Sequence, residues 1–244
     1  RIVGYLSAAS VRAECLSNMP GTNPLRSWKR GAWNNTDGWP VSVTHGFARM
    51  WFGRGTRVWA SGSDNFTSFA GGTEADKAIS GRLGIGSPEA IRWLGFTQHL
   101  VIGTKTREFL GLGNTNNEAV GPTNFQTIPS QNEGGSNIMP AVVPGSILFV
   151  HRTRRKLVQL TSDPKSVSET AYVAVDLNRL SSDLVKNNIV RVAVQHEPER
   201  RVFVVLDSGV CHVLLFRREE EVVAWTTVKT DGHIEDDSVV PQND

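Results

Sequence analysis

Cysteine is scarce in this chain of 244 residues, which contains only Cys15 and Cys211, far apart in the sequence. Two distant cysteines exclude a disulfide framework and a four-cysteine zinc site, and they favour a reducing, intracellular origin. Long apolar runs are also missing, since no stretch reaches the roughly 18 residues of a membrane-spanning helix. Residues 1–6 have neither the length nor the cleavage pattern of a secretory signal, so we expect no membrane anchor.

An excess of charge of one sign is missing as well. The 26 Lys and Arg residues nearly balance the 24 Asp and Glu residues, which gives a formal net charge of +2. A protein whose affinity for nucleic acid comes mainly from phosphate neutralisation has a strongly basic composition. The composition therefore does not favour nucleic acid as the principal ligand, and it describes a globular chain long enough to bury a sizeable core.

What the sequence does contain is a repeated β-rich unit. Pairs of short apolar runs joined by a polar turn are typical of β-hairpins, and they recur about every 50 residues, at residues 50–60, 100–110, 147–158 and 202–215. A further apolar run precedes each hairpin, at residues 39–44, 91–96, 138–143 and 189–194. The unit is thus a three-stranded antiparallel meander, and its spacing matches that of a propeller blade.

These meanders predict an all-β fold, a β-propeller of about five or six blades that is incomplete in this segment. A fifth unit is expected to begin at residues 222–228. Residues 39–244 form the expected propeller domain, and residues 1–38 an irregular N-terminal segment. Because the chain starts at Arg1 rather than Met and the residues at its end suggest no terminal element, we expect a piece of a longer chain.

Other segments interrupt the hairpin pattern. The polar stretches 61–86 and 111–137 are too long for ordinary hairpin loops and are expected to be surface excursions or contact arms. One helical periodicity predicts a short helix at residues 176–186, with Asp176 as N-cap and an apolar face made of Leu177, Leu180, Leu184 and Val185.

Histidines offer a candidate metal site. His45, His99 and His196 occupy the same place in three of the units, in or beside the turn between the first two strands. None of them has a second ligand at the short spacing that zinc sites usually show. We therefore predict turn histidines exposed to solvent, with no metal site and no cofactor.

Catalytic motifs are missing too. The phosphate-binding loop, the Gly-x-Ser-x-Gly elbow and His-Glu-x-x-His do not occur, and the Gly-x-Gly within residues 81–86 precedes no helix. A propeller glycosidase would gather two carboxylates from different blades. However, residues 61–66 depart from the Asp-box pattern Ser-x-Asp-x-Gly-x-Thr-Trp, and residues 219–221 are typical of a solvated charged turn. We assign no catalytic, cofactor-binding or metal residue and predict no enzyme activity.

The strongest basic cluster lies at residues 151–156, in the turn of the third hairpin, and further arginine pairs occur at 200–201 and 217–218. Such a turn is usually a solvated face, and its functional interpretation is contact with nucleic acid phosphates or with an acidic partner. Neither interleaved exposed aromatic residues nor a groove-entering helix supports base-specific recognition. We expect most tryptophans to pack within the sheets: Trp39, Trp51, Trp59, Trp93 and Trp225.

Short phrases occur along the chain in a fixed order. They include Gly38-Trp-Pro-Val-Ser-Val-Thr44, Arg49-Met-Trp-Phe-Gly53, Val58-Trp-Ala-Ser61, Ile91-Arg-Trp-Leu94, Leu148-Phe-Val150, Arg218-Glu-Glu-Glu-Val-Val-Ala-Trp225 and Thr230-Asp231-Gly232. In this order they resemble the tail tubular protein B, or nozzle, family of short-tailed bacteriophages, together with the related packaged-DNA stabilisation proteins. The resemblance covers roughly residues 38–232 and departs from the family pattern at Met50, Arg54 and Glu220.

The resemblance implies a structural virion protein, a propeller-bearing subunit of a sixfold tail ring beneath the portal and adaptor proteins. It also implies assembly in the host cytoplasm, a final place in the virion tail, rim loops that meet tail fibres, and non-specific contact with double-stranded DNA passing through the channel. Two alternatives stay open at the level of the sequence. One is a propeller glycosidase or glycan-binding protein such as a host-surface depolymerase, and the other is a cellular propeller scaffold that binds peptides.

Overall fold

The structure is a computed structural model, and it describes residues 2–7, 10–13, 32–84, 89–114, 119–168, 170–217 and 222–239. The chain divides into two units, Arg1–Gly38 and Trp39–Asp244. The first unit contains an antiparallel hairpin of β1 (Ile2–Ser7) and β2 (Ser10–Ala13). A segment expected to be irregular therefore begins with a short hairpin, while residues 14–31, Cys15 among them, lie outside the described residues.

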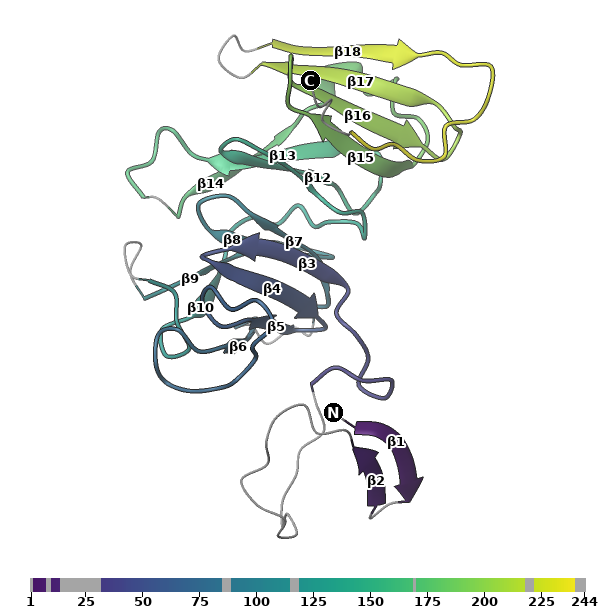
Figure 1. The fold of residues 1–244 in the computed structure, drawn as a ribbon. Coiled ribbons are helices and arrows are strands. Elements are labelled where there is room, and N and C mark those ends of the chain that lie inside the picture. The colour runs from purple at the N-terminus through teal and green to yellow at the C-terminus, as the bar shows by residue number, and fades with distance from the viewer. Residues whose placement is uncertain are drawn as a thin grey trace. The chain divides into compact units, whose positions relative to one another are not determined.

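The described part of the second unit forms four antiparallel meanders of four strands each, here called sheets 1 to 4 in chain order (Figure 1). Within every sheet the strands pair in sequence order, so the first and last strands are the edges. Sheet 1 contains β3 (Ser42–Gly46), β4 (Arg49–Arg54), β5 (Arg57–Ala60) and β6 (Ile79–Arg82); sheet 2 contains β7 (Ile91–Phe96), β8 (Leu100–Thr104), β9 (Glu108–Leu112) and β10 (Gln126–Pro129). Sheet 3 contains β11 (Ala141–Val143), β12 (Ser146–Val150), β13 (Leu157–Ser162) and β14 (Tyr172–Asp176); sheet 4 contains β15 (Ile189–Gln195), β16 (Arg201–Leu206), β17 (Cys211–Arg217) and β18 (Val222–Val228).

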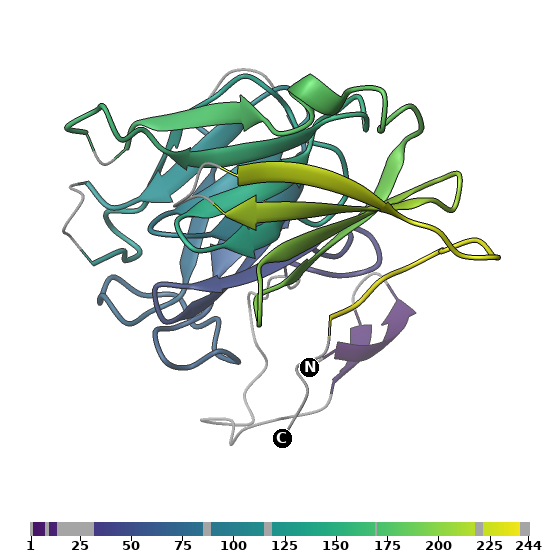
Figure 2. The same cartoon turned by 90° about the horizontal axis from the view of Figure 1, so that it is seen from above.

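The sheets follow one another as layers, and Figure 2, which looks down on them, shows sheet 4 in front. Three apolar clusters lie between them, one between each pair of neighbouring sheets. Successive side chains of a strand point to opposite faces. In β12, Ile147 and Phe149 accordingly join the cluster shared with sheet 2, whereas Leu148 and Val150 join the cluster shared with sheet 4. The inner strands are therefore apolar on both faces, which explains their nearly continuous hydrophobic sequence.

One backbone hydrogen bond recurs where consecutive sheets meet. The turn between the second and third strands of a sheet accepts it, and the chain leading into the next sheet donates it. Ile91 N–H donates to Gly55 O, Gly135 N–H to Thr104 O, and Ile189 N–H to Arg154 O, each at 2.7 Å. The first strands are also in contact in succession, β3 with β7, β7 with β11, and β11 with β15. The sheets thus repeat in their packing as well as in their internal order.

Residues 176–186 do not form the expected helix. β14 continues through Asp176, where it pairs with Val158 of β13, and only the short 3-10 helix η1 (Arg179–Ser181) follows. The predicted apolar face is also divided, because Leu177 and Val185 are buried in the cluster between sheets 3 and 4 while Leu180 is 99% exposed. The leucine spacing arises from a loop that touches the core at two points. Among the described residues, no helix has the length and apolar character needed to cross a membrane.

The prediction that a fifth unit begins at residues 222–228 is wrong as well. Residues 222–228 are β18, which pairs along its whole length with β17 and completes sheet 4. The fourth strands of sheets 1 and 2, β6 and β10, lie inside the polar stretches that were expected to be surface excursions. Each unit is therefore four-stranded, and its last strand is an edge of the sheet.

Arg49 in β4 holds the polar stretch after sheet 1's third strand against the sheet. Its side chain is 1% exposed and its guanidinium donates to the backbone carbonyls of Ser61 (2.6 Å), Lys77 (2.7 Å) and Ala75. A buried guanidinium needs such acceptors, since an unpaired charge in the core is costly. Hydrogen bonds from one arginine thus hold the loop that joins β5 to β6 against the sheet.

Candidate functional site

The basic cluster predicted from the sequence lies in the turn between β12 and β13. We call residues 152–156 the basic turn. His151 N–H donates to Lys156 O (2.9 Å) and Arg154 N–H to His151 O (2.8 Å), which closes the turn on itself. Arg154 adopts a left-handed backbone conformation with φ of 59°, uncommon for a residue other than glycine. The turn therefore has a defined shape.

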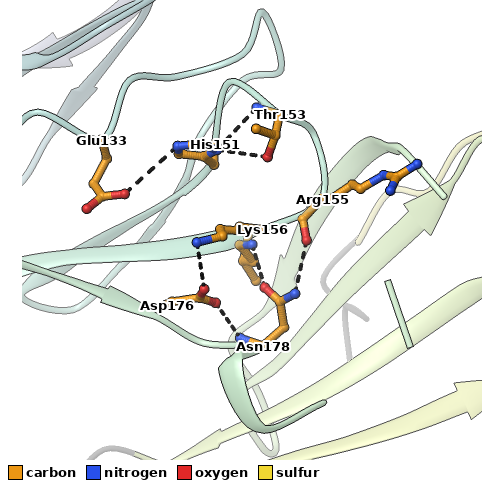
Figure 3. Close-up of polar contacts among 8 residues, drawn as sticks. Glu133, His151, Thr153, Arg155, Lys156, Asp176 and Asn178 are labelled. Atoms are coloured by element: carbon orange, nitrogen blue, oxygen red, sulfur yellow. Dashed lines mark hydrogen bonds and ion pairs between the residues drawn. The ribbon is translucent and has the colours of Figure 1, made fainter. Parts of the chain in front are cut away.

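Side chains at the end of β14 and directly after it support the basic turn (Figure 3). The buried Asn178 accepts a hydrogen bond from Leu157 N–H (2.9 Å) and donates one to Arg155 O (3.0 Å). Asp176 accepts one from Asn178 N–H (3.1 Å), and its other oxygen lies 3.3 Å from Lys156 Nζ. Loop 177–188 and the basic turn are consequently held as one polar assembly.

His151 closes the other side of this assembly (Figure 3). Its Nδ1 accepts the N–H of Thr153 (3.2 Å) and lies 2.8 Å from Thr153 Oγ1, so the ring proton belongs on Nε2, which faces Glu133 Oε2 at 3.9 Å. Burial lowers the pKa of His151, and the charge of Arg152 lowers it further. The histidine therefore serves as a neutral hydrogen-bonding group at neutral pH.

The basic turn contains four cations, and their side chains differ in what they contact. Lys156 is paired with Asp176 and Arg154 Nε donates to Ile189 O (3.2 Å), whereas Arg152 and Arg155 are exposed and form no ion pair within the described residues. Two free guanidiniums on a fixed turn can attract phosphates or carboxylates without reading a sequence. The predicted contact surface is thus reduced to two arginines.

The arginine pair at residues 200–201 is not brought to this surface. The start of β15 is bonded to the basic turn through Ile189, while residues 200–201 follow the far end of that strand. Arg201 is paired there with Glu199 at 3.2 Å. Arg218 and residues 219–221 lie outside the described residues.

The three turn histidines have different environments. His45 and His196 are exposed, as predicted. His99 is 5% exposed and its Nδ1 lies 3.2 Å from the hydroxyl of Tyr172, so the prediction of a solvent-exposed histidine is wrong there. The part of the chain that the structure describes contains no group of three or more His, Cys, Asp and Glu residues placed to hold a metal ion.

Glu108 is a buried carboxylic acid that the sequence reasoning missed. It lies in β9 with no exposed surface, its Oε1 accepts Gly134 N–H (3.0 Å), and its Oε2 has no partner among the described residues. Burial raises the pKa of Glu108 to about 7, against the lowering effect of the Gly134 and Glu133 backbone N–H groups. One acidic residue in an otherwise apolar run, 108–112, was the available signal.

Two cavities lie beside sheet 1. One of about 400 Å³ is lined by Arg54 and Arg92 together with apolar side chains, and another of about 380 Å³ is lined by Arg49 and Asp76 among others. Glycoside hydrolysis of the usual kind needs two carboxylates around the sugar. Among the described residues, neither lining contains two carboxylates, and Glu108 belongs to neither.

No protein-family model matches the chain, and no curated protein matches it either.

Proposed function

We propose that the four sheets are consecutive blades of a β-propeller. Radial β architectures repeat a four-stranded antiparallel meander around an axis. Three features support this arrangement: the common strand order of the sheets, the recurring bond from each second turn to the next sheet, and the successive contacts of the first strands. Each blade then interacts mainly with its neighbours, as in other repeat proteins.

We further propose that the chain is a structural virion protein, a subunit of the tail nozzle of a short-tailed bacteriophage. The observation that carries this proposal is the ordered series of phrases, whose members fall on strands of all four sheets. The phrase 38–44 leads into β3, 91–94 opens β7, 148–150 lies in β12, and the described part of 218–225 opens β18. The phrases are therefore distributed over every sheet in sequence order, as a resemblance that covers the whole proposed propeller requires.

In this role the chain acts mechanically. Copies of it form a sixfold ring below the adaptor and portal proteins, retain the packaged DNA, and let it pass when the tail opens. Tight phosphate binding would obstruct that passage. The electrostatic part of the affinity for DNA increases with each phosphate that the protein neutralises. The nearly balanced net charge and the two free arginines of the basic turn suit weak, non-specific contact with DNA or an acidic partner.

The copy number in purified virions tests this function. Quantitative mass spectrometry compares peptides of the chain with those of the portal and capsid proteins of the same particles. Half the copy number of the portal protein is expected, because a closed sixfold ring lies under a twelvefold portal. Three copies per tail fibre would instead indicate a fibre-associated depolymerase, and absence from the virion would indicate a cellular scaffold; either result overturns the nozzle proposal.

A further inference from the structure

The cavity of about 400 Å³ between sheets 1 and 2 has an unusual lining. Apolar surface comes from Val41, Ala90 and Ile91, and polar surface from the side chains of Arg54, Arg92 and Asn137. Its position is fixed, because the junction bond from Ile91 N–H to Gly55 O joins two of its lining residues. None of the described residues that line it is acidic.

The positive charge of this cavity is not neutralised by the described residues. Arg54 Nη1 donates to Trp39 O (2.7 Å), and Arg92 Nη1 donates to Asn137 Oδ1. Both acceptors are uncharged, and neither arginine forms an ion pair within the described ranges. Arg92 Nε is shielded from solvent and has no hydrogen-bond partner there either. Two guanidiniums with unused donors thus share one cavity.

The backbone geometry at position 92 does not by itself require an arginine. The pairing of β7 with β8 is irregular between Ile91 and Trp93, which makes Arg92 the extra residue of a β-bulge. β15 has the same irregularity between Ile189 and Arg191, and its extra residue is Val190. Bulges commonly redirect a side chain toward a functional site. Since valine occupies the equivalent position of sheet 4, the bulge itself does not require a guanidinium, and the hydrogen bond to Asn137 uses only Nη1 of Arg92.

We propose that Arg54 and Arg92 together bind a phosphate oxyanion in this cavity. A guanidinium presents a fork of donors that suits phosphate and carboxylate oxygens. One fork satisfies the two oxygens of a carboxylate, whereas the tetrahedral oxygens of a phosphate accept from two forks on different strands. The phosphate comes from free inorganic phosphate or from a phosphodiester of DNA. This proposal does not depend on the nozzle function.

Titration of the full chain with inorganic phosphate, at an ionic strength held constant with sodium chloride, tests the proposal. The Nε–Hε signals of Arg54 and Arg92 are followed by NMR, and the affinity is measured by calorimetry. We expect saturable binding of one phosphate per chain. Arg92→Val, which copies the bulge of sheet 4, and Arg54→Gln should each weaken binding by about tenfold or more, the effect of losing a charged hydrogen bond. Arg57→Gln removes an exposed charge from the neighbouring strand β5 and should leave the affinity within about twofold.

A short duplex DNA identifies the source of the phosphate. If a phosphodiester is the ligand, the duplex competes with inorganic phosphate and loses affinity in the Arg92→Val variant; if free phosphate is the ligand, it does neither. The absence of saturable shifts at both arginines, or an equal affinity in all three variants, would overturn the proposal. Thermal unfolding checks that each variant is folded, and Arg54→Gln decides the question if Arg92→Val is not.

Discussion

Ile234 donates its backbone N–H to the carbonyl oxygen of Gly209, at 3.1 Å. Gly209 lies in the turn between the second and third strands of sheet 4, so this bond repeats the ones that Ile91 and Ile189 make to the corresponding turns of sheets 1 and 3. Arg191 of β15 also pairs with Asp236 through two hydrogen bonds. The segment after β18 thus continues the recurring junction, which adds a fourth instance to the support for the propeller proposal.

Asn178 is expected to stabilise the basic turn. Asn178→Ala leaves Leu157 N–H and Arg155 O without their partners in a buried place, and each unmet group is costly. We expect a loss of about 2 kcal/mol in the free energy of unfolding, measured by urea denaturation. Asn188→Ala, which removes an exposed contact to Asp207, is the control and should change it by less than about 0.5 kcal/mol. Equal effects in the two variants would contradict the supporting role of Asn178.

Arg49 is expected to be the anchor of residues 61–78. Arg49→Met keeps much of the buried volume but leaves three backbone carbonyls without a donor, so the free energy of unfolding should fall by about 3 kcal/mol. Hydrogen exchange at Ser63 and Lys77, which both bond within this loop, should accelerate before global unfolding does. Unchanged exchange in Arg49→Met would show that the loop is held by other contacts; Arg57→Met is the matched surface control.

The hairpins could be predicted because their signals are local. Apolar runs joined by short polar turns specify pairing between neighbours in the sequence. The fourth strands β6 and β10 give no such signal, because each has only four residues and contains polar side chains at a sheet edge. β14 is largely apolar, but residues 163–171 separate it from β13, so no tight turn indicates that the two strands pair. The sequence therefore predicts a three-stranded unit and assigns residues 222–228 to a new one.

The environments of single polar residues depend on contacts between distant segments. His99 is buried because Tyr172 of sheet 3 lies against it, and nothing near position 99 in the sequence indicates this. Asn178 acts on a turn more than twenty residues before it. The cavity between Arg54 and Arg92 likewise joins residues from two sheets. Local pattern thus predicts strands, whereas these sites arise from the packing of sheets.

The basic turn is expected to account for weak binding of polyanions. Arg152→Gln combined with Arg155→Gln removes two exposed guanidiniums that form no ion pair among the described residues, so the stability at neutral pH should not change by more than about 0.5 kcal/mol. Fluorescence anisotropy with a labelled duplex should show weaker binding, and the slope of log affinity against log salt should fall by about 2. Arg201→Gln, at the far end of sheet 4, should leave the slope nearly unchanged. If it lowers the slope as much as the double variant does, the contact surface is not the basic turn.

Glu108 makes the stability of the protein depend on pH. Burial raises its pKa from an ordinary value of 4.5 to about 7, so the folded chain binds a proton that the unfolded chain has lost between these pH values. The free energy of unfolding should therefore fall as pH rises through this window, by about 3 kcal/mol in total. His151 acts in the opposite direction, because its lowered pKa makes protonation costly at acid pH.

Glu108→Gln keeps the acceptor for Gly134 N–H and removes the ionisation, so the difference in the free energy of unfolding between the wild type and this variant isolates the contribution of Glu108. Urea denaturation from pH 4.5 to 8 should show that difference growing with pH, with the exposed Glu74→Gln as a control that follows the wild type. A constant difference across this range would mean that Glu108 stays ionised in the folded chain.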